Sequence, residues 1–191
     1  HYPLRRQRQM CIRDSNTEKG SLERMTDGGG VARPGDGPRH MVFSADGSRA
    51  YGVNELTSSV TFYQQKNGKL TPVQHISSLP NPSPEGSTAA EIAIHPNGRY
   101  LVSSNRGYDS LACYAIDAEK GTLSLVGITP LAVKTPRHFT ITANGRYVLA
   151  AGQGSDAIEV LSFDASSGKL SSTDERLNIG SPVCLIWKES H

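Results

Sequence analysis

Arginine, histidine and glutamate residues recur beside short apolar segments of this chain, where they could carry proton transfer and anion binding. They are Arg39, His40, Glu91, Arg137 and His138 at the starts of such segments, and Glu55 and Arg106 just after others. A histidine or a carboxylate can take a proton from water. An arginine can stabilise a developing oxyanion, and its planar guanidinium suits a phosphate or a carboxylate.

The elements that must position these residues form a block that occurs three times. Each copy has an apolar run, a two-residue turn and a second apolar run, and the turns are Asp46-Gly47, Asn97-Gly98 and Asn144-Gly145. The turn glycines are 51 and 47 residues apart. A repeat of this length built of short strands is typical of a β-propeller. The sequence therefore predicts an all-β partial β-propeller of about three complete four-stranded antiparallel blades plus two partial blades.

The middle copy shows the expected blade most clearly. Its strands are predicted at residues 91–95, 99–104, 111–116 and 123–128, and the third strands of the other copies at 59–63 and 157–163. No segment keeps a 3.6-residue apolar period, so little helix is expected.

The partial blades lie at the two ends of the repeat. One begins at Lys19-Gly20-Ser21-Leu22, and the other is a single first strand over Pro182–Trp187. Within residues 1–15, Met10–Ser15 resembles a translated sequencing-adapter scar; a natural basic or disordered tail is the alternative. Residues 16–191 are therefore predicted to be the C-terminal part of a single, larger β-propeller domain.

Charge and cysteine content exclude several classes of function. Residues 1–15 hold four arginines and one aspartate, so the remaining chain has 16 basic and 17 acidic side chains. This balance gives no reason to expect nucleic acid or a membrane surface as partner. No apolar run approaches the ~18 residues of a membrane span. Cys113 and Cys184 are expected to pack in blade interiors, and no metal-ligand spacing is present. We expect no metal, no cofactor and no obligate protein partner, in a cytoplasmic protein.

Hairpin geometry indicates where the polar residues gather. Pairing across a two-residue turn places Arg39 opposite Asn54, and Arg137 opposite Gly152, at the end of the blade away from the turn. Since first strands line the channel of a propeller, these ends should meet around one channel mouth. The alternatives are structural: arginine struts between blades, a Glu55–Arg106 ion pair and a hydrogen-bonded His40. His75 and His95 lie away from this mouth and are expected to be structural.

Several short motifs, in order and one repeat apart, carry a resemblance to a known family. They are Gly37-Pro38-Arg39-His40, Val53-Asn54-Glu55, Ala89-Ala90-Glu91-Ile92, Ser104-Asn105-Arg106-Gly107, Thr135-Pro136-Arg137, Ala151-Gly152-Gln153 and Ser181-Pro182-Val183-Cys184. With them the chain resembles the lactonase family of seven-bladed β-propellers, which includes 6-phosphogluconolactonases and is similar to the carboxy-muconate cyclases. The resemblance covers residues 16–191.

The resemblance implies roles for six residues. His40, Glu91 and Arg106 would be catalytic, and Arg39, Glu55 and Arg137 would bind substrate. His138 follows the Pro-Arg motif where the family varies, and no role carries over to it. No metal enters this chemistry.

The expected activity is hydrolysis of a sugar lactone, with 6-phosphogluconolactone of the pentose phosphate pathway as the first candidate and 6-phosphogluconate as its product. A muconate-type cycloisomerase that closes a lactone, and a non-catalytic propeller that binds a ligand or a protein, are the alternatives. Because about half a ring would leave blade faces and the channel open, the chain alone is expected to associate and to lack activity.

Overall fold

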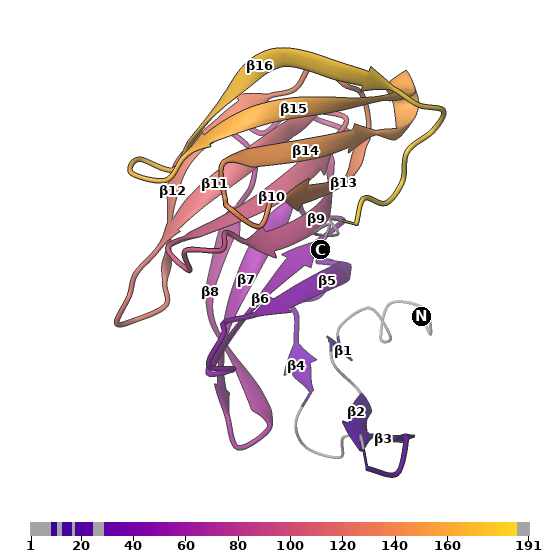
Figure 1. The fold of residues 1–191 in the computed structure, drawn as a ribbon. Helices are drawn as coiled ribbons and strands as arrows, with labels where there is room; N and C mark the ends of the chain where they lie inside the picture. Colours follow the sequence, from indigo (N-terminus) through magenta and orange to yellow (C-terminus); the bar gives the residue numbers. More distant parts are fainter. Residues whose placement is uncertain (1–8, 11–12, 17, 25–28, 187–191) are drawn as a thin grey trace.

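Three four-stranded antiparallel sheets, each formed by consecutive strands, make up most of the chain (Figure 1). The computed structural model describes residues 9–10, 13–16, 18–24 and 29–186. The first blade consists of β5 (Pro38–Phe43), β6 (Arg49–Asn54), β7 (Ser59–Lys66) and β8 (Lys69–Ser77). The second consists of β9 (Thr88–Ile94), β10 (Tyr100–Arg106), β11 (Ser110–Ile116) and β12 (Leu123–Pro130). The third consists of β13 (Pro136–Ile141), β14 (Tyr147–Gly152), β15 (Ala157–Asp164) and β16 (Lys169–Asn178).

These blades confirm the predicted all-β partial propeller. Within the described ranges, the single helical segment is the short 3-10 turn η1 (Gln153–Ser155). The N-terminal part adds two small antiparallel pairs. In one, β1 (Gln9–Met10) pairs with β4 (Gly30–Val31); in the other, β2 (Arg13–Asn16) pairs with β3 (Ser21–Arg24). Strands thus occur inside residues 1–15, and the origin of that segment stays a prediction.

The structure corrects the expected strand at the C-terminal end. Pro182–Ile186 forms no strand, and Trp187 lies outside the described residues. A strand is stabilised by its hydrogen-bonded ladder. A second strand that could pair with this segment does not follow it in the described part of the chain, which accounts for the difference.

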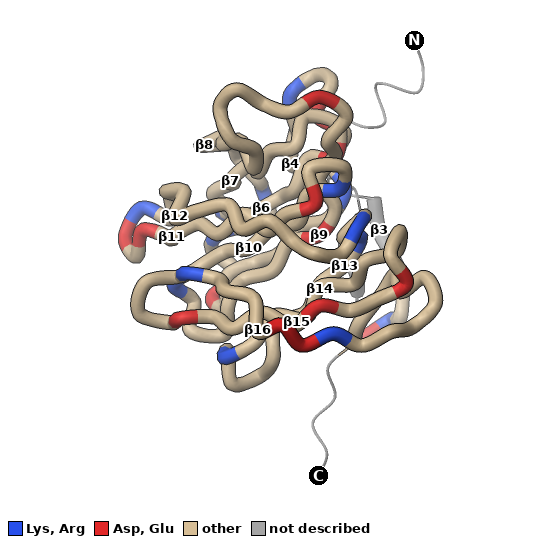
Figure 2. Tube along the Cα trace, turned by 90° about the horizontal axis from the view of Figure 1, so that it is seen from above, with Lys and Arg blue, Asp and Glu red and all other residues tan. Residues whose placement is uncertain are grey.

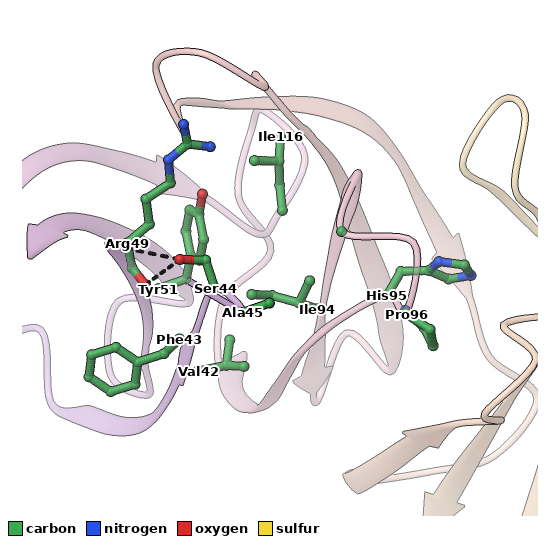
Figure 3. A pocket seen from close by; sticks show the side chains of 11 residues that line it. Val42, Phe43, Ser44, Ala45, Arg49, Tyr51, Ile94, His95, Pro96 and Ile116 are labelled. Carbon is green, nitrogen blue, oxygen red and sulfur yellow. Dashed lines mark hydrogen bonds between the residues drawn. The ribbon is translucent and has the colours of Figure 1, made fainter. Parts of the chain in front are cut away.

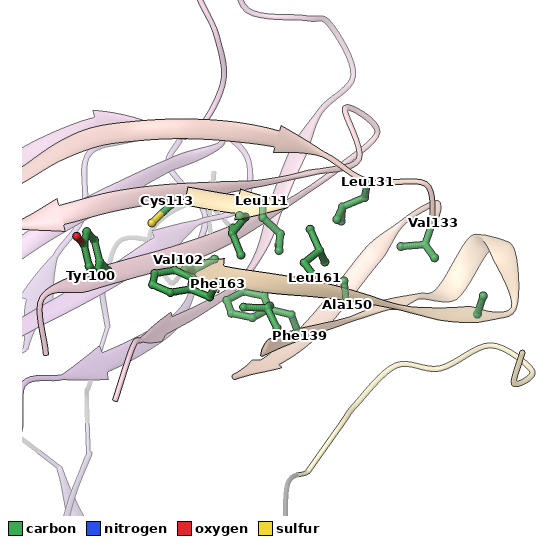
Figure 4. Packing of buried hydrophobic residues seen from close by; sticks show 13 residues of the cluster. Tyr100, Val102, Leu111, Cys113, Leu131, Val133, Phe139, Ala150, Leu161 and Phe163 are labelled. Atoms are coloured by element: carbon green, nitrogen blue, oxygen red, sulfur yellow. The ribbon is translucent and has the colours of Figure 1, made fainter. Parts of the chain in front are cut away.

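Apolar faces of successive blades form the core. Between the second and third blades, Val102, Leu111 and Cys113 pack in one cluster with Leu161 and Phe163 (Figure 4). Burial raises the pKa of the Cys113 thiol to about 12, so this residue is a small apolar core residue and not a nucleophile. Cys184, in contrast, is exposed. Its predicted packing in a blade interior is wrong because the strand that would have buried it does not form.

A second contact between blades joins each last hairpin to the blade before it. The Tyr51 hydroxyl donates to the Gly121 carbonyl at 2.9 Å, and the Tyr100 hydroxyl donates to the Ser166 carbonyl at 3.0 Å. The hairpin glycines allow this approach, since a Cβ on Gly168 would lie 2.5 Å from the Tyr100 ring. Tyr147 aligns with Tyr100 in the repeat and is 42% exposed.

This packing predicts different costs for the same substitution in two hairpins. Gly68 and Gly168 both have positive φ, but the space around a Cβ at Gly68 is open. We expect Gly168→Ala to lower the free energy of unfolding by about 2–4 kcal/mol, because left-handed strain adds to overpacking against Tyr100. Gly68→Ala should cost only the strain, about 1–2 kcal/mol. Urea unfolding followed by circular dichroism measures both, and equal losses would contradict the contact.

Candidate functional site

A β-bulge at the same place in each blade shapes the mouth of the would-be channel. Near the turn, Met41 lies opposite Gly52 and His40 opposite Val53 as predicted, but Asn54 lies opposite Pro38. The expected Arg39–Asn54 and Arg137–Gly152 pairings are therefore wrong by one residue, because Arg39 and Arg137 are extra residues in their strands. Equivalent register shifts occur where β9 pairs with β10 and where β13 pairs with β14.

The bulge changes which side chains can reach the neighbouring blade. In a regular strand, consecutive side chains point to opposite faces. Here Arg39 donates to the Ala90 carbonyl, while His40 contacts the Glu91 carboxylate, so both side chains reach the second blade. Bulges that re-aim side chains are common beside active sites.

Glu91 is the centre of the site. It comes from β9 of the second blade and is only 8% exposed. The His40 Nδ1 atom of the first blade lies 2.9 Å from Glu91 Oε1 and 3.0 Å from Oε2. The His138 Nε2 atom of the third blade lies 3.3 Å from Oε2. One buried carboxylate therefore joins imidazoles from both neighbouring blades.

A second ion pair lies on the same mouth. An Arg106 Nη2 donates to Glu55 Oε1, joining the second blade to the first. The same nitrogen lies 3.3 Å from the Ala89 carbonyl oxygen. The structural alternative of a Glu55–Arg106 pair is thus present, and it places the Arg106 guanidinium at the mouth as well.

The pKa of Arg39 reflects the charged side chains around it. Burial lowers the pKa of its guanidinium, and the Arg106 cation lowers it further. The Glu55 and Glu91 carboxylates raise it, and Arg137 again lowers it. Arg106 and Arg137 are therefore both close enough to repel Arg39, which makes the mouth receptive to an anion.

Arg137 differs from the other two arginines. Its side chain is partly buried, yet in the described part of the chain neither a hydrogen bond nor an ion pair engages its guanidinium. Arg39 is held by a carbonyl and Arg106 by a carboxylate. Arg137 is thus the cation best placed to receive an external anionic group.

The structure brings the six predicted site residues to one mouth, while their chemical roles stay predictions. His138 lies at the same mouth, although the family resemblance implies no role for it. The repeat gave a signal, since Pro136-Arg137-His138 matches Pro38-Arg39-His40 and therefore puts His138 directly after the extra residue of the bulge. His95 lies at the turn end as predicted, with Nε2 2.8 Å from the Gly145 carbonyl oxygen and its ring stacked on Phe163. His75, on the outer strand β8, lies 2.9 Å from Ser59 Oγ and 3.2 Å from Asp36 Oδ1.

Two features lie away from this mouth. A cavity of about 330 Å³ opens at the turn end of the first two blades, lined by Val42, Phe43, Ile94 and Ile116, with Arg49 at its edge (Figure 3). Positive and negative residues are mixed over the turns (Figure 2). The arginine group at the mouth is thus set apart by its burial and not by a one-sided surface charge.

Neither a metal-ligating cluster nor a helix long enough to span a membrane occurs among the described residues. No group of three or more His, Cys, Asp or Glu residues there is arranged to hold a metal ion. Among the same residues, none of the helical segments has the length and apolar character that crossing a bilayer requires.

Comparison with known proteins identifies the class. The lactonase family of seven-bladed β-propellers matches residues 9–187, and the chain belongs to this family. A 6-phosphogluconolactonase of Formosa agariphila is 37% identical over 111 residues, covering 57% of this chain and 31% of that protein. A 6-phosphogluconolactonase of Serratia proteamaculans is 37% identical over 125 residues, covering 64% and 38%.

Solved structures agree with this class. A periplasmic gluconolactonase of Pseudomonas aeruginosa superposes with a TM-score of 0.78 at 34% identity, covering 81% of this chain and 43% of that one. A Lactobacillus plantarum protein superposes with a TM-score of 0.83 at 28% identity, covering 90% and 50%. The chain thus spans half or less of the length of these relatives.

The Glu55–Arg106 pair can be tested for coupling. We expect Glu55→Gln to lower the free energy of unfolding by about 1–2 kcal/mol, because it leaves the largely buried Arg106 cation without its carboxylate. Arg106→Met should also destabilise. The double variant should lose about 1 kcal/mol less than the sum of the two, since each single change breaks the same pair. Strict additivity in urea unfolding would show that the two side chains do not interact.

Proposed function

We propose that the channel mouth hydrolyses a sugar lactone, and that 6-phosphogluconolactone is its substrate. One observation carries the proposal. The Glu91 carboxylate holds His40 through Nδ1, while His40 Nε2 has no partner in the described part of the chain and the side chain is 44% exposed. An imidazole fixed at one nitrogen and open at the other suits general acid–base catalysis. The names of the two curated 6-phosphogluconolactonases support the substrate class.

The residues have distinct parts in this mechanism. His40 Nδ1 lies closer to the Glu91 oxygens, at 2.9 and 3.0 Å, than to Arg39 Nη1, at 3.3 Å, which favours a proton on Nδ1 that is donated to the carboxylate. Nε2 would then carry the lone pair that takes a proton from water. The resulting hydroxide attacks the lactone carbonyl carbon, and an Arg106 N–H stabilises the negative charge on the carbonyl oxygen. The ring C–O bond then breaks, and His40 Nε2–H returns the proton to the leaving oxygen. Water is added across one ester bond, and the product is the open sugar acid.

The remaining groups orient the substrate. Arg137, which has no protein partner in the described ranges, would bind the phosphate with its planar fork, and Arg39 would add a second donor. Glu55 holds Arg106 and can accept a hydrogen bond from a sugar hydroxyl. Three arginines against two carboxylates leave a net positive site for an anionic substrate.

A second candidate substrate is an unphosphorylated gluconolactone, because the Pseudomonas aeruginosa relative is named a periplasmic gluconolactonase. The cytoplasmic prediction belongs with the first candidate, since the relative named for gluconolactone is named as periplasmic. A cycloisomerase would use the same arginines for carboxylates. A binding protein would bind the acid without turnover.

Ring completeness is part of the proposal. The described residues form three complete blades, whereas the family has seven. We expect the chain alone to associate through its uncovered blade faces and to turn over no lactone, because its channel stays open to water. Joining the N-terminal blades of a lactonase-family relative ahead of this chain would close the ring and give the form in which activity is measured.

The catalytic roles are tested in that seven-bladed form. His40→Ala and Glu91→Gln should each lower kcat for 6-phosphogluconolactone by about 10²–10⁴, the range for a general acid–base residue. Arg146→Ala, a change at an exposed arginine at the turn end, is the control and should leave kcat unchanged. Hydrolysis is followed by acid release in weakly buffered solution. Unchanged turnover in both site variants would remove them from the mechanism, and formation of lactone from a muconate would favour the cycloisomerase.

The phosphate role of Arg137 gives a separate prediction. Arg137→Ala should weaken binding of 6-phosphogluconate about 10- to 100-fold, because a charge-assisted hydrogen bond is lost. Binding of gluconate should change much less. Arg146→Ala is again the matched control and should affect neither ligand. Calorimetric titration of the seven-bladed form measures all four affinities, and an equal loss for gluconate and 6-phosphogluconate would place the phosphate elsewhere.

A further inference from the structure

The buried Glu91 carboxylate has a second imidazole partner that the mechanism above does not use. We propose that His138 is a positioning residue, whose Nε2–H donates to Glu91 Oε2 and thereby holds the carboxylate that orients His40. The inference rests on the proposed function for its catalytic meaning. The hydrogen-bond arrangement itself can be tested without any lactone.

The proton on His138 is placed by its other nitrogen. The backbone N–H of Leu185 points at His138 Nδ1 at 3.3 Å. A backbone N–H can only donate, so Nδ1 must be the acceptor, and a neutral ring then carries its proton on Nε2. That nitrogen is the one that lies 3.3 Å from Glu91 Oε2. The Leu185 backbone thus selects the tautomer that can donate to the carboxylate.

The two carboxylate oxygens are not equally well supplied with donors. Oε1 accepts from the Ile92 backbone N–H at 3.0 Å and faces His40 Nδ1 at 2.9 Å. Oε2 shares the same His40 nitrogen at 3.0 Å, and among the described residues the other imidazole nitrogen within ion-pair distance of it is His138 Nε2 at 3.3 Å. A buried carboxylate oxygen without a donor is costly. Without His138, the carboxylate would gain by turning Oε2 toward water or toward an arginine, and His40 would lose its fixed partner.

Electrostatics favour a neutral His138. Burial lowers the pKa of its imidazole, the Glu91 carboxylate raises it, and His40 and Arg39 lower it again. The net direction is downward, so near neutral pH the ring stays uncharged. A neutral donor steadies Glu91 without cancelling its negative charge, which leaves that charge to stabilise the imidazolium of His40 during proton transfer.

The contacts of Glu91 with His40 and His138 also span three blades. His40, Glu91 and His138 occupy the bulge region at the start of the first strand in successive blades. Leu185, which lies beyond the third blade, adds the chain that follows β16. The orientation of the catalytic imidazole therefore depends on the stacking of all three blades.

The test uses the 191-residue chain with ¹⁵N-labelled histidine. Solid-state spectra of imidazole nitrogens need no monomer, so association of the chain does not interfere. At pH 7 we expect His138 Nδ1 to give the signal of an unprotonated nitrogen and Nε2 that of a protonated one; His138→Gln identifies these signals by their loss. The opposite tautomer, or an imidazolium at pH 7, would overturn the proposal.

Two variants separate positioning from packing. His138→Gln keeps an N–H donor where Nε2 lies, and His138→Leu keeps an apolar side chain without a donor. The protonated Nδ1 signal of His40 should persist in the Gln variant, and in the Leu variant it should split or broaden as Glu91 turns. In the seven-bladed form, kcat should fall about tenfold in the Leu variant with KM unchanged, and the Gln variant should recover most of it.

These outcomes also distinguish the two proposals. An unchanged His40 signal in the Leu variant would show that His138 does not hold Glu91. If the tautomer and the rescue by Gln are observed but the seven-bladed form hydrolyses no lactone, the proposed function fails and the assignment of His138 stands.

Discussion

A carboxylate buried between blades constrains the rest of this structure. Glu91 is 8% exposed, and a charge in such a place is stable only when donors surround it. His40 of the first blade lies 2.9 Å from this carboxylate, and His138 of the third blade lies 3.3 Å from it. The charge therefore favours one arrangement of three separate sheets, and the apolar packing of their faces gives that arrangement its stability. The Glu91 side chain therefore serves both the proposed chemistry and the assembly of the blades.

The bulges explain how apolar sheets can carry such a charged group. A regular strand would place Arg39 and His40 on opposite faces, one of them in the apolar layer between blades. The extra residue turns both toward the mouth, where Arg39 bonds a backbone carbonyl and His40 bonds a carboxylate. The two charged residues therefore lie at the start of β5, and the rest of this strand, Met41-Val42-Phe43, is apolar. The same device recurs in β9 and β13, so one blade design serves three different sets of side chains.

Much of the fold follows from local signals, because each blade is defined by short-range pairing. The turn glycines and apolar alternation predict the strands and their antiparallel order, and the register near Met41 follows from the two-residue turn. Register at the mouth does not, since a bulge depends on tertiary contacts that no local pattern records. Cys184 was misplaced for a similar reason: a first strand needs a second strand to pair with. The family resemblance implies no role for His138, because the family varies at this position. The stacking of the second and third blades nevertheless brings His138 to Glu91.

The turn end and the mouth end of the blades have different roles. At the turn end, glycines such as Gly121 and Gly168 let a tyrosine of the preceding blade bond a hairpin carbonyl, and a Cβ at either glycine would clash with a neighbouring side chain. That end tolerates little variation in size. At the mouth, the position after the extra residue holds His40 in the first blade, and the aligned positions hold Glu91 in the second and His138 in the third. A substitution at the mouth alters charge and proton transfer and can remove a contact between blades there, while the tyrosine–hairpin contacts at the opposite end remain. The contacts at the turn end therefore keep part of the blade stacking intact when the chemistry at the channel mouth changes.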